Sequence, residues 1–244
     1  MTNRFDSALA QDACGNGLFA ALPEDALLTW LPDLEQIDLT LGQVLYEVEA
    51  TPAHAYFPTT SIVSLLYKMD NGESAEIAIV GNDGMVGISL FMGGGATSSR
   101  AVVQNAGLGF RVTAAVLKRE CARGGATLHQ LLKYTQALMS QMTLTAACNR
   151  HHTFPQQLSR WILLSLDRLK GNEMVMTQQL LANMLGTTPE QVAECASELH
   201  QRGLIDYQEG TIIVRDRKGI EASSCECYFV VKAEYDRLLQ RAGK

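Results

Sequence analysis

The sequence predicts an α+β fold with three consecutive parts, and three observations lead to this expectation. Short apolar runs separated by turn residues extend from Ile37 to about Thr113, at spacings of about 8–12 residues that are typical of a β sandwich or barrel. Helical periodicity follows over residues 128–149. Two short helical segments and a hairpin pattern complete the chain. We therefore expect three parts, with the boundaries 1–123, 124–150 and 151–244.

The first part begins with short helices and continues as strands. Residues 18–36 have helically spaced leucines, but Pro23 and Pro32 divide this segment into short pieces. Strand-like runs such as "QVLYEVE" and "SRAVVQNAG" follow, and Asn71-Gly72 and "NDG" at 82–84 mark turns between them. These strands and turns predict a β sandwich or barrel.

Composition excludes several classes of protein. Hydrophobic residues make up 47% of the chain and charged residues 19%, which is ample for a core and argues against disorder. The formal net charge of −6 argues against whole-chain electrostatic capture of nucleic acid or of an anionic membrane. The first ten residues are too polar for a signal peptide, and no apolar run approaches the roughly 18 residues of a membrane span. We expect a cytoplasmic protein that does not bind membranes.

The six cysteines do not follow a recognised ligand pattern in the sequence. They are Cys14, Cys121, Cys148, Cys195, Cys225 and Cys227. A disulfide framework is not expected in the reducing cytosol, and the spacing of the last two is too short for the usual zinc motif. We expect ordinary packed or surface thiols and no metal site, with a metal or redox role as the alternative.

The long helical segment has an apolar repeat close to 3.5 residues, which is the signature of a coiled coil. We expect it to form the seam of a homodimer, in which the small polar members fix the register. The alternative is a helix that packs on its own domain. The expected seam positions are Leu128, Leu131, Leu132, Thr135, Leu138, Met139, Met142, Thr145, Ala146 and Asn149.

The stretch "MTQQLLANMLGTTPEQV" at 176–192 has the signals of two helices joined by a tight turn. Thr177 is suited to cap the first helix, and Gly186 supplies the positive φ that ends it. Thr188 is suited to cap the second helix, with Pro189 at its first position and Gln191 completing a capping box. We therefore expect a helix-turn-helix.

A hairpin and a final helix follow this unit. "RGLIDYQEGTIIVRD" predicts two strands around Glu209-Gly210, and the tail from Ser223 to Ala242 predicts an amphipathic helix. Helix, turn, helix and hairpin together indicate a winged helix-turn-helix rather than an unspecialised helical pair. The expected DNA-contacting residues are Thr177, Gln178, Thr187, Thr188, Pro189, Glu190, Gln191, Glu194, Arg202, Arg215, Arg217 and Lys218.

Several motifs together resemble the CRP/FNR family of bacterial transcription regulators, from about Leu18 to Leu239. They are "YFPTTSIVSLL" at 56–66, "EIAIVGNDGMVGISLFMGG" at 76–94, "SRAVVQNAG" at 99–107, the long helix, "MTQQLLANMLG" at 176–186 and "CECYFVVKAEYDRLL" at 225–239. The resemblance implies a jelly-roll sensor domain like those that bind cyclic nucleotides, a dimerising helix and a DNA-reading winged helix.

The sensor part departs from the pattern of the family members that bind cyclic nucleotide. Those members hold the ribose with a Gly-Glu pair and the phosphate with an Arg, but here Gly87 precedes Ile88 and the phosphate position falls on Ser99. Arg100 follows the phosphate position by one residue, so its side chain is expected to face away from the pocket. For Arg100, a surface salt bridge and a contact to an anion are equal alternatives. Cyclic AMP bound in the usual mode is therefore not expected. The expected ligand-binding residues are Val86, Gly87, Ile88, Ser89, Ser98, Ser99, Arg100 and Ala101.

Other modes of sensing in the family are not supported either. An iron–sulfur member would need several cysteines near the N-terminus, where only Cys14 stands, and none of the five histidines lies in a haem-ligand motif. We predict no cofactor and leave the small-molecule effector unidentified.

The reading helix departs from the family as well. No Lys or Arg stands between residues 177 and 201, while Glu190, Glu194 and Glu198 line one helical face. Residues 151–244 carry 11 basic and 12 acidic residues, whereas a sequence-specific DNA binder is normally more basic. Contacts to DNA are therefore expected to be weaker or differently targeted than in members with arginines here.

Two functions remain open from the sequence. The first is a dimeric transcription regulator that binds an operator in double-stranded DNA, with RNA polymerase as a further candidate partner. The second is a family member with weakened or lost DNA specificity, which acts through a protein partner or a heterodimer. No enzymatic activity is expected, because the chain lacks a phosphate loop, a nucleophile motif and clustered carboxylates.

Overall fold

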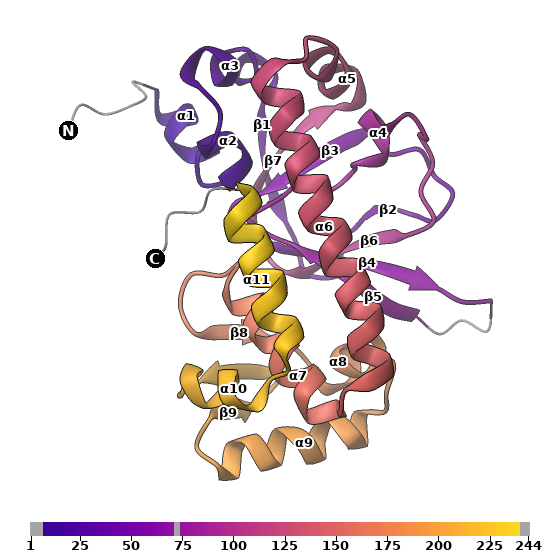
Figure 1. Cartoon of the computed structure of the whole chain (residues 1–244), viewed down its shortest axis with the longest axis vertical. Helices are drawn as coiled ribbons and strands as arrows, with labels where there is room; N and C mark the ends of the chain where they lie inside the picture. Colours follow the sequence, from indigo (N-terminus) through magenta and orange to yellow (C-terminus); the bar gives the residue numbers. More distant parts are fainter. Residues whose placement is uncertain (1–6, 71–73, 240–244) are drawn as a thin grey trace.

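The computed structural model describes residues 7–70 and 74–239 and confirms the α+β class (Figure 1). Seven strands form the roll that occupies the upper half of the molecule in Figure 1. They are β1 (Glu35–Leu39), β2 (Val44–Tyr46), β3 (His54–Pro58), β4 (Ile62–Lys68), β5 (Ser74–Val80), β6 (Arg100–Asn105) and β7 (Gly107–Thr113).

The roll is built from two antiparallel sheets, with strand orders β1-β7-β3 and β2-β6-β4-β5. The predicted Asn71-Gly72 turn lies outside the described residues. The predicted turn at 82–84 is confirmed, because the Gly84 N–H donates to the Gly81 carbonyl at 3.1 Å. Strands β3 and β4 are buried along most of their length, and β1 and β2 are largely exposed. The apolar side chains of both sheets belong to one buried cluster.

Short helices flank the roll. The prolines break the N-terminal segment as expected, and Phe19, Trp30 and Phe57 pack ring against ring to fix it to the sheet. The flanking helices are α1 (Ala8–Ala13), α2 (Gly17–Ala20), α3 (Glu24–Leu28), the 3-10 helix Leu31–Asp33, α4 (Ser89–Met92) and α5 (Ala114–Ala122).

Two long helices lie side by side along the molecule (Figure 1). The first, α6 (Gly125–His151), has 27 residues. The second, α11 (Glu226–Leu239), runs antiparallel to it. The Gln141 amide donates to the Tyr235 hydroxyl at 3.1 Å and to the Ile79 carbonyl at 3.0 Å, so α6 contacts both α11 and the roll.

The C-terminal unit contains the predicted helix-turn-helix and hairpin, and a strand that the sequence did not indicate. The third strand, β8, pairs with the outer side of the hairpin in the order β8-β10-β9. The elements are α7 (Phe154–Leu166), β8 (Glu173–Val175), α8 (Gln178–Leu185), α9 (Pro189–Gln201), β9 (Ile205–Gln208), β10 (Thr211–Val214) and α10 (Arg217–Ser223).

This C-terminal unit packs directly on the roll. One continuous cluster of buried apolar residues extends from Ala10 through the strands to Leu239. Helix α8 lies against β5, and Met184 contacts the Ser64 hydroxyl of β4 at 3.9 Å. No helix among the described residues has the length and apolar character required to cross a membrane.

Candidate functional site

The helix-turn-helix forms as its capping residues predict. The Thr177 hydroxyl accepts from the Leu180 N–H at 3.2 Å, and Gly186 ends α8 with φ of 64°. The Thr188 hydroxyl accepts from the Gln191 N–H at 3.3 Å, at the start of α9. The expected capping box is only half present, because in the described structure the Gln191 amide oxygen accepts from the Thr187 hydroxyl rather than from the Thr188 N–H.

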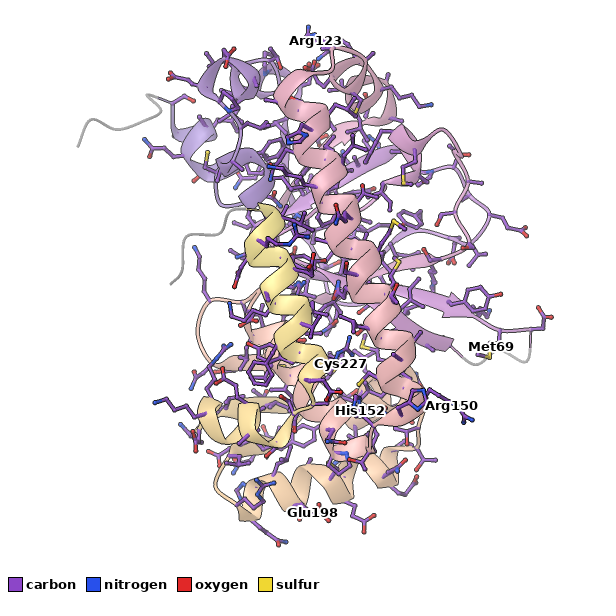
Figure 2. The ribbon with its side chains drawn as sticks, in the orientation of Figure 1. Met69, Arg123, Arg150, His152, Glu198 and Cys227 are labelled. Atoms are coloured by element: carbon purple, nitrogen blue, oxygen red, sulfur yellow. The ribbon has the colours of Figure 1, made fainter. Side chains whose placement is uncertain are left out.

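Helix α9 turns an acidic face outward. Its inner residues Val192, Cys195 and Leu199 are buried, which leaves the opposite side in solvent. The exposed side chains are Glu190, Gln191, Glu194, Ser197, Glu198, His200 and Gln201. Glu198 points away from the body of the molecule in Figure 2. The first turns of α9 are therefore accessible from solvent, and the charged side chains that they expose are carboxylates.

The Glu190 carboxylate is held in its ionised form at the start of α9. Hydrogen bonds from its own backbone N–H and from the Thr188 hydroxyl lower the pKa of Glu190. An anion at a helix N-terminus also interacts favourably with the helix dipole. Glu190 is thus oriented as an acceptor, and an acceptor at this position suits the exocyclic amine of cytosine in the major groove.

The basic residues near the wing differ in their availability. Arg217 donates to Asp167 and Glu221 at 2.5 and 2.9 Å and to the Tyr228 hydroxyl, so it joins α10 to α7 and α11. This pairing disfavours the expected phosphate contact by Arg217. The other expected phosphate contacts lie at the surface: Arg215 donates to Asp206, Arg202 donates to Ser223, and Lys218 is exposed.

The wing itself is a two-residue hairpin. Glu209 and Gly210 both have positive φ, 49° and 76°, as a tight turn between two antiparallel strands requires. Thr177 and Gln178, at the start of α8, are exposed on the same unit. The wing tip carries Gln208 and Glu209, so it adds no positive charge.

In the roll, Ser99 lies in the bend before β6, and Arg100 is the first residue of that strand. The expectation that Arg100 faces away from the pocket stays a prediction. Ser99 is buried and hydrogen-bonds the Thr97 hydroxyl at 3.1 Å and the Tyr46 side chain. Burial raises the pKa of Tyr46 to about 12. The Arg100 guanidinium lies 3.1 Å from the Glu47 carboxylate at the edge of the sheet. The surface salt bridge expected as one alternative for Arg100 is therefore present.

Most of the remaining expected ligand residues are buried in the roll or hydrogen-bond within it. Val86, Gly87 and Ala101 are buried, and Val86 bridges to Tyr56 through backbone hydrogen bonds. The Ser89 hydroxyl donates to the Gly95 carbonyl at 3.0 Å, which closes the loop after α4. Ile88 precedes α4 and Ser98 is exposed. The binding role of these residues stays a prediction.

The expected seam of α6 divides between two faces. Leu131, Thr135 and Leu138 are buried within the subunit, so the expectation that they face a partner is wrong. The periodicity identified them as one stripe of the helix, but α6 packs on α11, β5, α5 and α2 of the same subunit. Leu132 and Met139, seven residues apart, are 52% and 58% exposed, and they remain available to a second chain.

The other seam positions follow the same division. Ala146 and Asn149 are exposed, while Leu128, Met142 and Thr145 are half-buried. The Thr145 hydroxyl donates to the Gln141 carbonyl and accepts from Arg160 at 2.6 Å, and the Thr135 hydroxyl donates to the Leu131 carbonyl. These two threonines therefore satisfy their polar groups inside the subunit rather than across a dimer.

A buried polar network joins the C-terminal unit to the roll, and the sequence did not indicate it. The Glu76 carboxylate of β5 accepts from the Ser64 hydroxyl at 2.6 Å and from the Trp161 indole of α7 at 2.9 Å. Gln104 of β6 accepts from Ser64 and donates to Ser165 of α7. Burial raises the pKa of Glu76 to about 7.

An ion pair between the two units lies nearby. The Arg168 guanidinium is 2.7 Å from the Asp83 carboxylate, and both side chains are almost fully buried. The Arg168 guanidinium also lies 5.2 Å from the centre of the Tyr235 ring. A cavity of about 600 Å³ opens beside this pair, between α2, α7, α10 and α11.

Three of the six cysteines are not scattered in the fold. Cys148, Cys225 and Cys227 meet His152 where α6 ends and α11 begins. The cysteines are far apart in the sequence, so their spacing suggested separate thiols. Cys148 and Cys225 are 77 positions apart, and no local sequence signal predicts a contact over that distance. The four-residue spacing of Cys148 and His152 is not a helical-face signal, because α6 ends at His151 and the backbone of His152 is extended.

Known proteins resemble this chain in part of its sequence and in most of its fold. The model of the Crp-like helix-turn-helix domain matches residues 156–223. FixK2 from Bradyrhizobium japonicum has 16% identity and a TM-score of 0.65, over 79% of this chain and 98% of its own. No curated protein matches the sequence.

Two further solved structures have the same fold. A CRP/FNR-family transcriptional regulator from Thermus thermophilus has 19% identity and a TM-score of 0.61, over 78% of this chain and 98% of its own. The c-di-GMP-responsive global regulator CLP from Xanthomonas campestris has 13% identity and a TM-score of 0.59, over 80% and 100%. The resemblance stated from the sequence is thereby confirmed: the chain has the CRP/FNR fold, with a Crp-like helix-turn-helix domain at residues 156–223.

Proposed function

We propose that this protein is a dimeric DNA-binding transcription regulator that responds to an unidentified signal. The observation that carries the proposal is the capped helix-turn-helix, in which the first turns of α9 stand exposed beside a wing. This arrangement is the one that places a helix in the major groove. Thr188, Glu190, Gln191 and Glu194 are the side chains that reach base edges in this proposal, and Arg202, Arg215 and Lys218 meet phosphates.

The dimer in this proposal forms along the outer face of α6. Leu132 and Met139 are large exposed apolar side chains with heptad spacing, and Ala146 and Asn149 continue the same face. Pairing there presents two α9 helices to one duplex. A signal that changes how the C-terminal unit packs on the roll then changes the distance between the two reading helices.

The proposed function is tested by binding to a labelled random-sequence duplex at about 50 and 200 mM salt. Arg202, Arg215 and Lys218 of two subunits neutralise about six phosphates, so log K is expected to fall with log salt with a slope of about −5.4. Binding with a slope of this size supports the proposal. No binding at about 50 mM salt contradicts it.

The second candidate is a regulator that has lost specific DNA binding and acts through a protein. The exposed row of Glu190, Glu194 and Glu198 favours it, because these carboxylates repel phosphates and suit a basic protein surface. A heterodimer along α6 is part of this alternative. It predicts that the purified chain sediments as a monomer and does not retain duplex DNA, whereas the first proposal predicts a dimer that does.

A further inference from the structure

Four side chains with metal-binding atoms converge at the lower end of the paired long helices (Figure 2). Cys148 and His152 come from the last turn and the cap of α6, and Cys225 and Cys227 come from the start of α11. The Cys148 and Cys225 sulfurs are 3.5 Å apart, and the Cys227 sulfur is 3.6 Å from His152 Nδ1. All four ligand atoms lie within 4.8 Å of one another.

These distances match the edges of a tetrahedral zinc site. With Zn–S bonds of about 2.3 Å and a Zn–N bond of about 2.05 Å, the S···S edges are about 3.8 Å and the S···N edges about 3.5 Å. The two closest pairs fall within about 0.3 Å of those lengths. Three thiolates and one imidazole form a closed ligand set, which is typical of structural rather than catalytic zinc.

The surroundings of His152 supply the support that a ligating imidazole needs. His152 Nδ1 faces the Cys227 sulfur, and His152 Nε2 lies 3.3 Å from the Glu226 carboxylate. A carboxylate on the far nitrogen fixes the ring orientation and keeps the proton away from the ligating nitrogen. Gln157 of α7 donates to the His152 carbonyl at 2.8 Å, which holds the backbone at this point.

The charge and burial of the cluster also fit a cation. Cys148, Cys225 and Cys227 are between 0% and 3% exposed and form an apolar cluster apart from the main core. Three thiolates and one Zn²⁺ carry a net charge of about −1. The buried Arg160 interacts electrostatically with the Cys148 and Cys227 sulfurs, so it offsets that charge.

Simpler accounts of the cluster leave part of it unexplained. A disulfide between Cys148 and Cys225 would use two of the four groups and leave Cys227 and His152 without a role. Ordinary packing of thiols does not require a histidine with one nitrogen on a sulfur and the other on a carboxylate. One tetrahedral ion accounts for all four groups and for Glu226.

We propose that Cys148, His152, Cys225 and Cys227 bind one structural zinc ion, which fastens α11 to the junction between α6 and α7. His152 caps α6 and α7 starts two residues later at Phe154, so this junction connects the long helix to the helix-turn-helix. The zinc ion therefore limits rotation of the DNA-binding unit relative to α6.

The first test is the metal content of the full-length protein, purified without added chelator and measured by mass spectrometry of the elements. We expect about one zinc per chain, and a loss of nearly all of it in Cys225→Ser. Cys195→Ser is the matched control, because Cys195 is also buried but lies on α9, outside the cluster. Zinc well below one equivalent in the wild type, or an equal loss in both variants, overturns the proposal.

A second test does not depend on how well the ligand variants fold. Chelated wild-type protein is titrated with Co²⁺ under reducing conditions, and we expect the visible absorption of a tetrahedral thiolate complex at one equivalent. Glu226→Gln, which leaves the four ligands in place, is expected to weaken Co²⁺ binding by about 10–100-fold. A featureless titration of the wild type, or a Cys148–Cys225 disulfide in protein that holds no metal, overturns the proposal.

Discussion

The helix-turn-helix unit has two faces that differ in how their polar groups are satisfied. On the outer face, Glu190, Glu194 and Glu198 of α9 stand in solvent without a Lys or Arg on the same helix. On the inner face, Glu76 of the roll and Arg168 of the unit are fully buried, and hydrogen bonds and an ion pair satisfy them. The inner face therefore sets where the unit sits, and the outer face is the one to which we assign DNA binding in the proposed function.

This difference separates stability from recognition. A buried polar group that loses its partner is costly, whereas an exposed charge is screened and contributes little to folding. Substitutions on the inner face are thus expected to change the free energy of unfolding. Substitutions on the outer face are expected to change DNA affinity and to leave folding intact.

The largest effect is expected from Arg168→Met. It leaves the Asp83 carboxylate buried without its main partner, which costs about 3–5 kcal/mol of unfolding free energy. Chemical denaturation measures this loss. Arg202→Met is the control, because Arg202 is exposed and donates only to Ser223 in the described contacts. A loss in Arg168→Met no larger than that in Arg202→Met would show that the inner face does not hold the unit.

A smaller effect is expected from Glu76→Gln, and it depends on pH. Because the folded pKa of Glu76 is about 7 and its ordinary value is 4.5, the protonated form stabilises the fold. That contribution is present below pH 4.5 and is lost as the pH rises through 7. In Glu76→Gln the side chain has the shape of the protonated acid and one acceptor and one donor group, and it does not titrate.

Denaturation at pH 5 and pH 8 measures this difference. Between pH 5 and pH 8, the free energy of unfolding of the wild type is expected to fall by on the order of 2–3 kcal/mol more than that of Glu76→Gln. Glu24→Gln, an exposed carboxylate on α3, serves as the control and should follow the wild type. Equal pH dependence in all three proteins would mean that Glu76 does not titrate in this range.

Met139→Glu tests the outer face of α6. A charge at this exposed seam position is expected to weaken the dimer by about 30-fold, or about 2 kcal/mol, without unfolding the subunit. Sedimentation over a range of concentrations measures the shift. Leu41→Glu, at a similarly exposed leucine in a turn of the roll, is expected to leave the dimer unchanged. A dimer that tolerates Met139→Glu uses another surface.

The smallest effect is expected from Glu194→Arg on the outer face of α9. Replacing a negative by a positive charge next to phosphates is expected to strengthen binding to a random duplex about tenfold, or about 1.4 kcal/mol, at low salt. Fluorescence anisotropy measures the affinity. Glu24→Arg makes the same charge change at the far end of the molecule and should have little effect. An unchanged affinity in Glu194→Arg would place this face outside the groove.

Local features of the fold were predictable from the sequence because their signals lie within a few residues. Thr177, Gly186 and Thr188 act as the caps and turn that their residue types favour, and Glu209-Gly210 forms the expected hairpin.

Features that depend on distant partners were not predictable. Periodicity identified an apolar stripe on α6, but it could not tell that the roll would cover Leu131 and Leu138 and leave Leu132 and Met139 exposed. The hydrogen bond between Glu76 and Trp161 joins residues 85 positions apart. The Cys148 and Cys225 contact depends in the same way on how α11 returns along α6.

In the proposed function, a dimer of this chain reads DNA with two α9 helices. Selection of bound duplexes from a random pool by the wild-type protein, followed by sequencing, tests it most directly. We expect enrichment of a two-fold symmetric site whose half-sites are about 10 base pairs apart, centre to centre. A bound fraction with the same sequence composition as the starting pool would contradict it.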